Sequence, residues 1–302
     1  MNRYLELNNA GLSLYSLPST SDKTNISILT KNTMNTWQPN RTFAEKRRDT
    51  EQGKKAENVF ERYAQDVLSI KYISYDELRC DAFEKHAPCD GFIISQDTTE
   101  SVLNELKTRL IEDTKNSLGY YVALSRSTKL FLKQENIGVV EIKSTKISNK
   151  KKAAATFSNY KDHSGVKRLV DEIRSNDDYL TYPHLIRSTT DLDSLIDYTT
   201  RYINYLIIEG IIPKDLSPVE QYKLFVEFER QEALPDYLVR IYVDEKANVA
   251  IIIGFIDKSH FYDNGLKVKR MPKTGKSEQA IYLSQNLSKG YCISKLSLPK
   301  DN

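Results

Sequence analysis

Apolar residues in the first half of the chain recur with two different periods. Over 53–68 they are spaced three and four residues apart, and the same spacing returns over 98–117. This period predicts two amphipathic helices. Shorter apolar runs over 89–95 and 138–143 predict strands. The first half therefore has the predicted order helix, strand, helix, strand.

The second half continues with helical patterns and ends with a pair of strands. A helix is predicted over 189–210, stopping at Gly210, and another over 217–234, where the first turn carries a capping box. Two apolar runs, 237–243 and 248–256, are separated by a short polar segment. They predict adjacent antiparallel strands.

This order of elements predicts an α/β fold with a mixed central sheet flanked by helices and a mostly helical insertion. Two roles remain open for the insertion: a separate lobe that contacts substrate or a second subunit, or a cover for one sheet face. The expected segments are an N-terminal arm or lead-in over 1–50, the first part of the core over 51–149, the insertion over 150–235, and C-terminal strands completing the core over 236–302.

Composition narrows the class of protein only a little. The chain has 302 residues and a formal net charge of +3, which is too small to indicate a polyanionic partner by itself. Its 3 cysteines are too few for a disulfide framework. No apolar run approaches the roughly 20 residues that a membrane-spanning helix needs, and the N-terminus lacks a signal-peptide pattern. We expect a cytoplasmic protein without membrane association.

Charged residues interrupt the apolar pattern at three places that share one chemistry. Glu141 and Lys143 stand two apart in the strand GVVEIKST, so both point to the same face. Asp90 opens the preceding predicted strand, and Glu57 lies four residues after Gly53 on the first helix. A buried charge is costly unless it is paired or coordinates a metal. The positions therefore indicate a functional site.

The order G-x3-E, then PCD, then EIK resembles the PD-(D/E)xK nuclease superfamily, whose fold is restriction-endonuclease-like. The resemblance implies that Asp90 is the first metal-binding carboxylate and Glu141 the second. It also implies that Lys143 is the catalytic lysine and that Glu57 is the helix glutamate completing the catalytic set.

The resemblance covers residues 53–145 and includes two departures. Cys89 separates Asp90 from the preceding proline, and the segment between the two metal-binding carboxylates is long. One assignment also stays open, because Glu61 lies four residues after Glu57 on the same flank of the helix.

The residue types fit phosphodiester hydrolysis independently of the family. Mg²⁺ is a hard cation that proteins hold through one or two carboxylates, with water and phosphate as further ligands. Asp90, Glu141 and the backbone carbonyl of Ile142 are the predicted metal ligands, and Mn²⁺ is expected to substitute for Mg²⁺. Lys143 is placed to orient or deprotonate the attacking water.

A lysine-rich segment follows the second strand. From Ile142 to Lys161 there are six lysines and no acidic residue. Such a segment predicts contacts with the phosphate backbone, although a solvated loop explains the composition equally well. The predicted DNA-binding residues are Lys146, Lys150, Lys151, Lys152 and Lys161.

The resemblance implies a Mg²⁺-dependent DNA endonuclease of a restriction or phage-defence system. DNA is the expected substrate, and a homodimer or a separate partner subunit is the expected assembly. One alternative is a catalytically inactive nucleic-acid-binding or regulatory protein that retains the nuclease fold. Another is a structural module in which the E-x-K triplet is coincidental.

Overall fold

The chain divides into two compact units. The first comprises Met1–Leu180, Pro235–Leu266 and Gln285–Asn302, and the second comprises Thr181–Leu234 and Lys267–Ser284. The computed structural model describes residues 5–7, 12–16, 30, 42–117, 122–147, 163–181, 200, 203–208, 210–232, 235–245, 247–261, 267–270 and 281–299.

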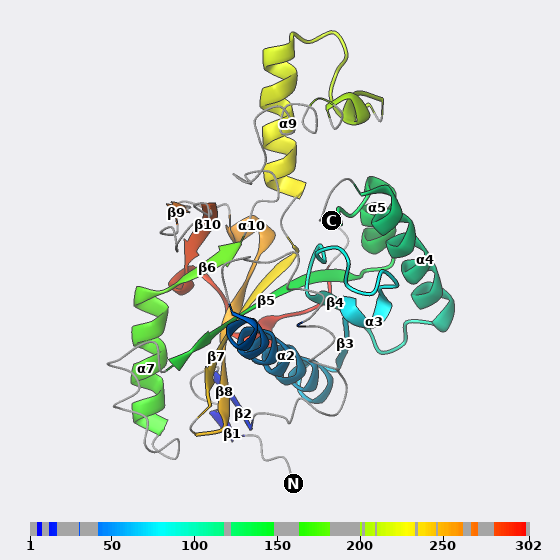
Figure 1. The fold of residues 1–302 in the computed structure, drawn as a ribbon. Coiled ribbons are helices and arrows are strands. Elements are labelled where there is room, and N and C mark those ends of the chain that lie inside the picture. The colour runs from blue at the N-terminus through cyan, green and yellow to red at the C-terminus, as the bar shows by residue number, and fades with distance from the viewer. Residues whose placement is uncertain are drawn as a thin grey trace. The chain divides into compact units, whose positions relative to one another are not determined.

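A mixed sheet of seven described strands forms the centre of the first unit (Figure 1). The strand order is β1-β2-β8-β7-β5-β4-β3. Neighbouring strands are antiparallel except for β5 and β7, which run parallel. The predicted α/β fold with a mixed sheet flanked by helices is confirmed. The strands are β1 (Leu5–Leu7), β2 (Leu12–Ser16), β3 (Ile70–Ser74), β4 (Gly91–Ser95), β5 (Gly138–Lys146), β7 (Tyr237–Asp244) and β8 (Val249–Asp257).

Strands β7 and β8 form the predicted antiparallel pair in the middle of the sheet. Their register places Leu238 opposite Ile256 and Val243 opposite Ala250. Every residue of β8 between its two ends is buried, as expected for a strand covered on both faces. The long apolar run therefore marks a central strand.

Helix α2 (Phe43–Asp66) covers one face of this sheet. Its apolar stripe, including Val59, Phe60 and Tyr63, is fully buried. The stripe belongs to one core with Val140 and Ile142, the residues of β5 that point to this face. The alternation predicted for β5 is thus confirmed, because its even-numbered apolar residues are buried under α2.

Three other helices pack on the opposite face: α3 (Tyr75–Leu78), α4 (Glu100–Asn116) and α5 (Arg126–Gln134). Leu106 of α4 and Phe131 of α5 share a second core with Phe92 of β4. Ile93, the next residue of β4, belongs to the core under α2. Strand β4 is therefore held from both faces.

Helix α2 begins at Phe43, well before the start that the apolar period predicts near Gly53. Thr42 caps it through a complete capping box, in which its hydroxyl accepts from the Glu45 backbone N–H and Glu45 accepts from the Thr42 backbone N–H. The first turns are polar, so apolar spacing predicts only the second half of the helix. Residues 43–50 of the expected lead-in are accordingly helical.

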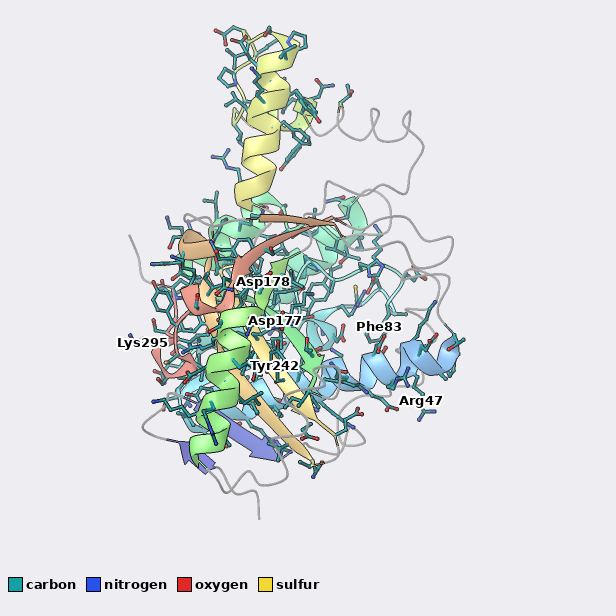
Figure 2. All side chains as sticks on the ribbon, turned by 90° about the vertical axis from the view of Figure 1, so that its left-hand side faces the viewer. Arg47, Phe83, Asp177, Asp178, Tyr242 and Lys295 are labelled. Carbon is teal, nitrogen blue, oxygen red and sulfur yellow. The ribbon has the colours of Figure 1, made fainter. Side chains whose placement is uncertain are left out.

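Helix α7 (His163–Asn176) and the residues that follow it belong to the first unit, although the predicted insertion covers them. Arg240 of β7 is 5% exposed, donates to Thr145 Oγ1 at 2.8 Å and pairs with Asp177 at 3.4 Å. Figure 2 shows Asp177 and Tyr242 on the side of the first unit where α7 lies. The pairing ties the chain after α7 to the central strands.

The second unit contains α9 (Pro218–Glu232), with the predicted capping box between Ser217 and Glu220. Residues 203–208 are helical, and the helix ends before Gly210, whose φ of 70° favours glycine. Strands β9 (Lys267–Arg270) and β10 (Ile281–Asn286) pair antiparallel. Leu206, Ile212 and Phe225 form a small core.

No helix that the structure describes is long and apolar enough to cross a lipid bilayer.

The early start of α2 has a measurable consequence. Thr42→Ala removes the hydroxyl that caps the helix and should lower the free energy of unfolding by about 1 kcal/mol. Thr42→Ser retains the hydroxyl and is expected to behave like the wild type. Urea denaturation followed by circular dichroism measures both variants. Equal stability of Thr42→Ala and the wild type would contradict the capping role.

Candidate active site

Asp90 and Glu141 lie close together at the start of β4 and in β5, and the charge of Glu141 acts on Asp90. Strands β4 and β5 are antiparallel, with Gly91 opposite Val140. Asp90 directly precedes β4. Its carboxylate accepts from the N–H of Ile142, the residue after Glu141, and the charges of Glu141 and Lys143 both act on its ionisation. The structure therefore brings together the two carboxylates that were predicted to bind one metal ion.

Asp90 is held at every backbone group and at one carboxylate oxygen. Its carbonyl accepts from the Tyr72 hydroxyl at 3.0 Å and the Tyr75 N–H at 2.9 Å, while its N–H donates to the Val140 carbonyl at 3.2 Å. Its Oδ2 accepts from the Ile142 N–H at 2.5 Å. The position of this carboxylate is thus set by β3, α3 and β5 together.

Lys143 forms an ion pair with Glu141 through Nζ and Oε1. Both side chains point away from α2, since Val140 and Ile142 point toward it. The Lys143 side chain is 36% exposed and that of Glu141 19% exposed. The predicted catalytic amine therefore lies directly beside a predicted metal ligand and remains accessible from solvent.

Glu57 projects from α2 and is 8% exposed. Its Oε2 accepts from the Lys54 ammonium at 2.7 Å and from the Ser74 hydroxyl at 3.0 Å. The negative charge of Glu57 also acts on the ionisation of Asp90. Of the two glutamates left open by the sequence, Glu57 is the one whose charge acts on Asp90.

The carboxylates of the site oppose one another's ionisation. Burial, followed by the charges of Glu141 and Glu57, raises the pKa of Asp90 well above its usual range. The Lys143 charge and the Ile142 N–H act in the opposite direction. Burial likewise raises the pKa of Glu57, and the Lys54 charge opposes the shift. Crowded, partly desolvated carboxylates of this kind favour the binding of a cation.

The donor set fits Mg²⁺. Asp90 and Glu141 supply two carboxylates, and Mg²⁺ is commonly held by one or two of them plus water and phosphate. The Ile142 carbonyl points to the same strand edge as its N–H, which donates to Asp90. Within the described residues there is no group of three or more His, Cys, Asp and Glu side chains placed to hold a metal. Water and substrate would complete the coordination.

Of the predicted DNA-binding lysines, the structure describes Lys146 alone. Lys146 pairs with both carboxylate oxygens of Glu245 at 2.9 Å. Lys150, Lys151, Lys152 and Lys161 lie outside the described residues. The role of this segment therefore stays a prediction.

Several residues that support the site were missed by the sequence analysis. Lys54 lies three positions before Glu57 on the helix, a spacing that could have identified the pair. Ser74 and Tyr72 carry no comparable signal, because they reach the site only through the pairing of β3 with β4.

Comparison with protein-family models, with curated proteins and with solved structures finds no match to this chain.

The raised pKa of Asp90 predicts that this carboxylate lowers the stability of the folded chain at neutral pH while it contributes to metal binding. When a folded-state carboxyl pKa lies above the unfolded value, stability is lost as pH rises through the window between them. At neutral pH, Asp90→Asn should therefore raise the melting temperature in EDTA, by about 2–4 °C for each kcal/mol of cost removed. The same variant should lose the stabilisation that Mn²⁺ gives the wild type.

Asp97→Asn is the matched control, because Asp97 is an exposed aspartate in the turn after β4. It should leave both melting temperatures unchanged. Differential scanning calorimetry with and without Mn²⁺ measures the three proteins. An Asp90→Asn protein that Mn²⁺ still stabilises as strongly as the wild type would remove Asp90 from the metal site.

Proposed function

We propose that the protein is a Mg²⁺-dependent DNA endonuclease of the PD-(D/E)xK type. The observation that carries this proposal is the position of the Asp90 carboxylate, which accepts from the Ile142 N–H between Glu141 and Lys143, while Lys143 is paired to Glu141. The motif order in the sequence supports it further. A coincidental E-x-K triplet on a solvated strand gives no reason for an aspartate carboxylate to bond to its backbone.

Each of the candidate site residues has a distinct task in this proposal. Asp90, Glu141 and the Ile142 carbonyl would hold the ion, which supplies neutralisation of charge on the attacking and leaving oxygens. Lys143 donates hydrogen bonds to the attacking water or the phosphate and stabilises developing negative charge. Glu57 of α2 adds a negative charge that acts on Asp90 and so favours a cation at the site.

The arrangement of elements also supports a restriction-endonuclease-like fold. Helix α2 carries Glu57, β4 begins after Asp90, and β5 carries the E-x-K triplet. These three elements come in the family order and are adjacent in space, with α2 on one face of the β4–β5 pair.

The proposed setting is a restriction or phage-defence system in the cytoplasm, with DNA as substrate. A homodimer would place two sites on one duplex, and a separate partner subunit would be a second route to selectivity. The free cysteines Cys80, Cys89 and Cys292 agree with a reducing compartment. Mn²⁺ is proposed to replace Mg²⁺.

Lys143→Ala tests the chemistry separately from binding. The variant should lose at least about 100-fold in the rate of plasmid cleavage in Mg²⁺, because the positioned amine is gone. Its affinity for DNA should stay within about threefold of the wild type, since most contacts go to phosphates elsewhere. Gel analysis of cleavage and fluorescence anisotropy in EDTA measure the two quantities.

Lys133→Ala, at an exposed position of α5, is the matched control and should cleave like the wild type. Equal losses of cleavage and binding in Lys143→Ala would show a structural role. A wild type that binds DNA but cuts none in Mg²⁺ or Mn²⁺ would favour the alternative, an inactive nucleic-acid-binding protein.

The lysine-rich segment gives an independent prediction. Reversing the charges of Lys150, Lys151 and Lys152 to glutamate should weaken DNA binding and reduce the salt dependence of affinity, by up to about three in the log–log slope. Anisotropy titrations between 50 and 200 mM salt, about the range over which phosphate contacts are lost, measure the slope.

Reversal of three exposed lysines on α4 and α5 controls for net charge. A slope unchanged in the segment variant, or changed equally in the control, would mean that the segment does not contact DNA. The control residues are Lys107, Lys115 and Lys133.

A further inference from the structure

A second lysine, Lys54, lies one helical turn before Glu57, and its ammonium group bridges two carboxylates from different elements. We propose that Lys54 is a positioning residue of the candidate active site, which immobilises Glu57 beside Asp90. The inference rests on the proposed nuclease function, because it gives Lys54 a task in that same site.

The geometry of the bridge is tight and largely sealed from solvent. Lys54 Nζ lies 2.7 Å from Glu57 Oε2 and 2.6 Å from Asp76 Oδ2. The exposed fractions of these side chains are 12% for Lys54, 10% for Glu57 and 17% for Asp76. Ion pairs at this depth are held in one geometry, unlike pairs on an open surface.

The far end of the bridge is itself anchored. Asp76 Oδ1 accepts from Arg79 Nη1 at 3.2 Å. Arg79 also donates to Asp81 from Nε at 2.7 Å and from Nη2 at 2.9 Å. The Asp76 N–H donates to Ser74 Oγ, which caps α3. The first turn of α3 therefore presents Asp76 to Lys54 as a fixed partner.

The near end of the bridge determines which oxygen of Glu57 is available. Oε2 accepts from both Lys54 and Ser74, while Oε1 accepts no hydrogen bond from any residue that the structure describes. Two donors on one oxygen restrict rotation of the carboxylate. Glu57 therefore keeps one oxygen for a water or a ligand of the site.

Lys54 remains a cation despite its burial. Burial alone lowers the pKa of a lysine, but the charges of Glu57 and Asp76 and their hydrogen bonds raise the pKa of Lys54 above its ordinary value. A permanently charged bridge offsets part of the repulsion that Glu57 exerts on Asp90. Lys54 on the helix thus complements Lys143 on the strand.

The competing explanation is a purely structural tether between α2 and α3. Such a tether would affect folding but would not act on metal binding through Glu57. A positioning role predicts instead that the effects of altering Lys54 and Glu57 are not additive, because both report on the same carboxylate. Metal affinity, measured without catalysis, separates the two explanations.

The experiment is a double-mutant cycle on the full chain with Lys54→Met, Glu57→Gln and the double variant. Mn²⁺ dissociation constants come from isothermal titration calorimetry, and cleavage rates come from the plasmid assay. Each single variant should weaken Mn²⁺ binding by about tenfold, as loss of an outer-shell partner typically does. The double variant should be no weaker than Glu57→Gln alone.

Two variants guard against a trivial loss of structure. Lys54→Arg keeps the charge and the donors, so it should restore most of the affinity. Asp76→Asn leaves Lys54 and Glu57 in place but weakens the anchor, so a smaller loss is expected from it even if Lys54→Met does not fold. Lys55→Met, at the next helix position, controls for loss of a lysine and should bind Mn²⁺ normally.

The outcomes distinguish this inference from the proposed function. A wild type that binds Mn²⁺ and cleaves DNA, combined with additive losses in the cycle, overturns only the role of Lys54. Normal Mn²⁺ binding by both Lys54→Met and Asp76→Asn would also overturn only the role of Lys54. A wild type that binds no Mn²⁺ overturns the proposed metal site and the positioning role together.

Discussion

The pairing register of β4 and β5 is the constraint on which the candidate site depends. It brings the residue before β4, Asp90, beside the Glu141 segment of β5, where the Asp90 carboxylate accepts from the Ile142 N–H, and a slip by one residue would break this arrangement. Packing prevents the slip, because Phe92 is buried under α4 and α5 while Ile93 is buried under α2. The cores on both faces of the sheet therefore determine how close two acidic side chains lie.

The site concentrates charge that does not favour folding. Burial raises the pKa of both Asp90 and Glu57, so each ionised carboxylate opposes the stability of the folded chain at neutral pH. Two lysines and the Ile142 N–H offset only part of this cost. A chain selected for stability alone would place apolar residues here, and retained buried charge is typical of functional sites.

What the sequence could predict depended on the range of the interactions involved. The face shared by Glu141 and Lys143 follows from the period of a strand and needs only their neighbours in the chain. The helix start at Thr42 was also local, since its capping box is readable, but apolar spacing does not report a polar first turn. The proximity of Asp90 to Glu141 is different, because strand register joins segments far apart in the chain and no periodicity of the sequence predicts it.

The same distinction explains why the residues behind the site escaped prediction. Lys54 and Glu57 share a helix, so their contact is a local one. The second partner of Lys54 is Asp76, which lies in α3 and reaches Lys54 only through the tertiary structure. Ser74 reaches Glu57 only because β3 pairs with β4 and α2 packs across both. Residue type and order identify the groups that could hold a metal, whereas the groups that orient them are chosen by tertiary structure. A residue such as Lys54, which bridges two elements, therefore cannot be identified from its neighbours in the sequence.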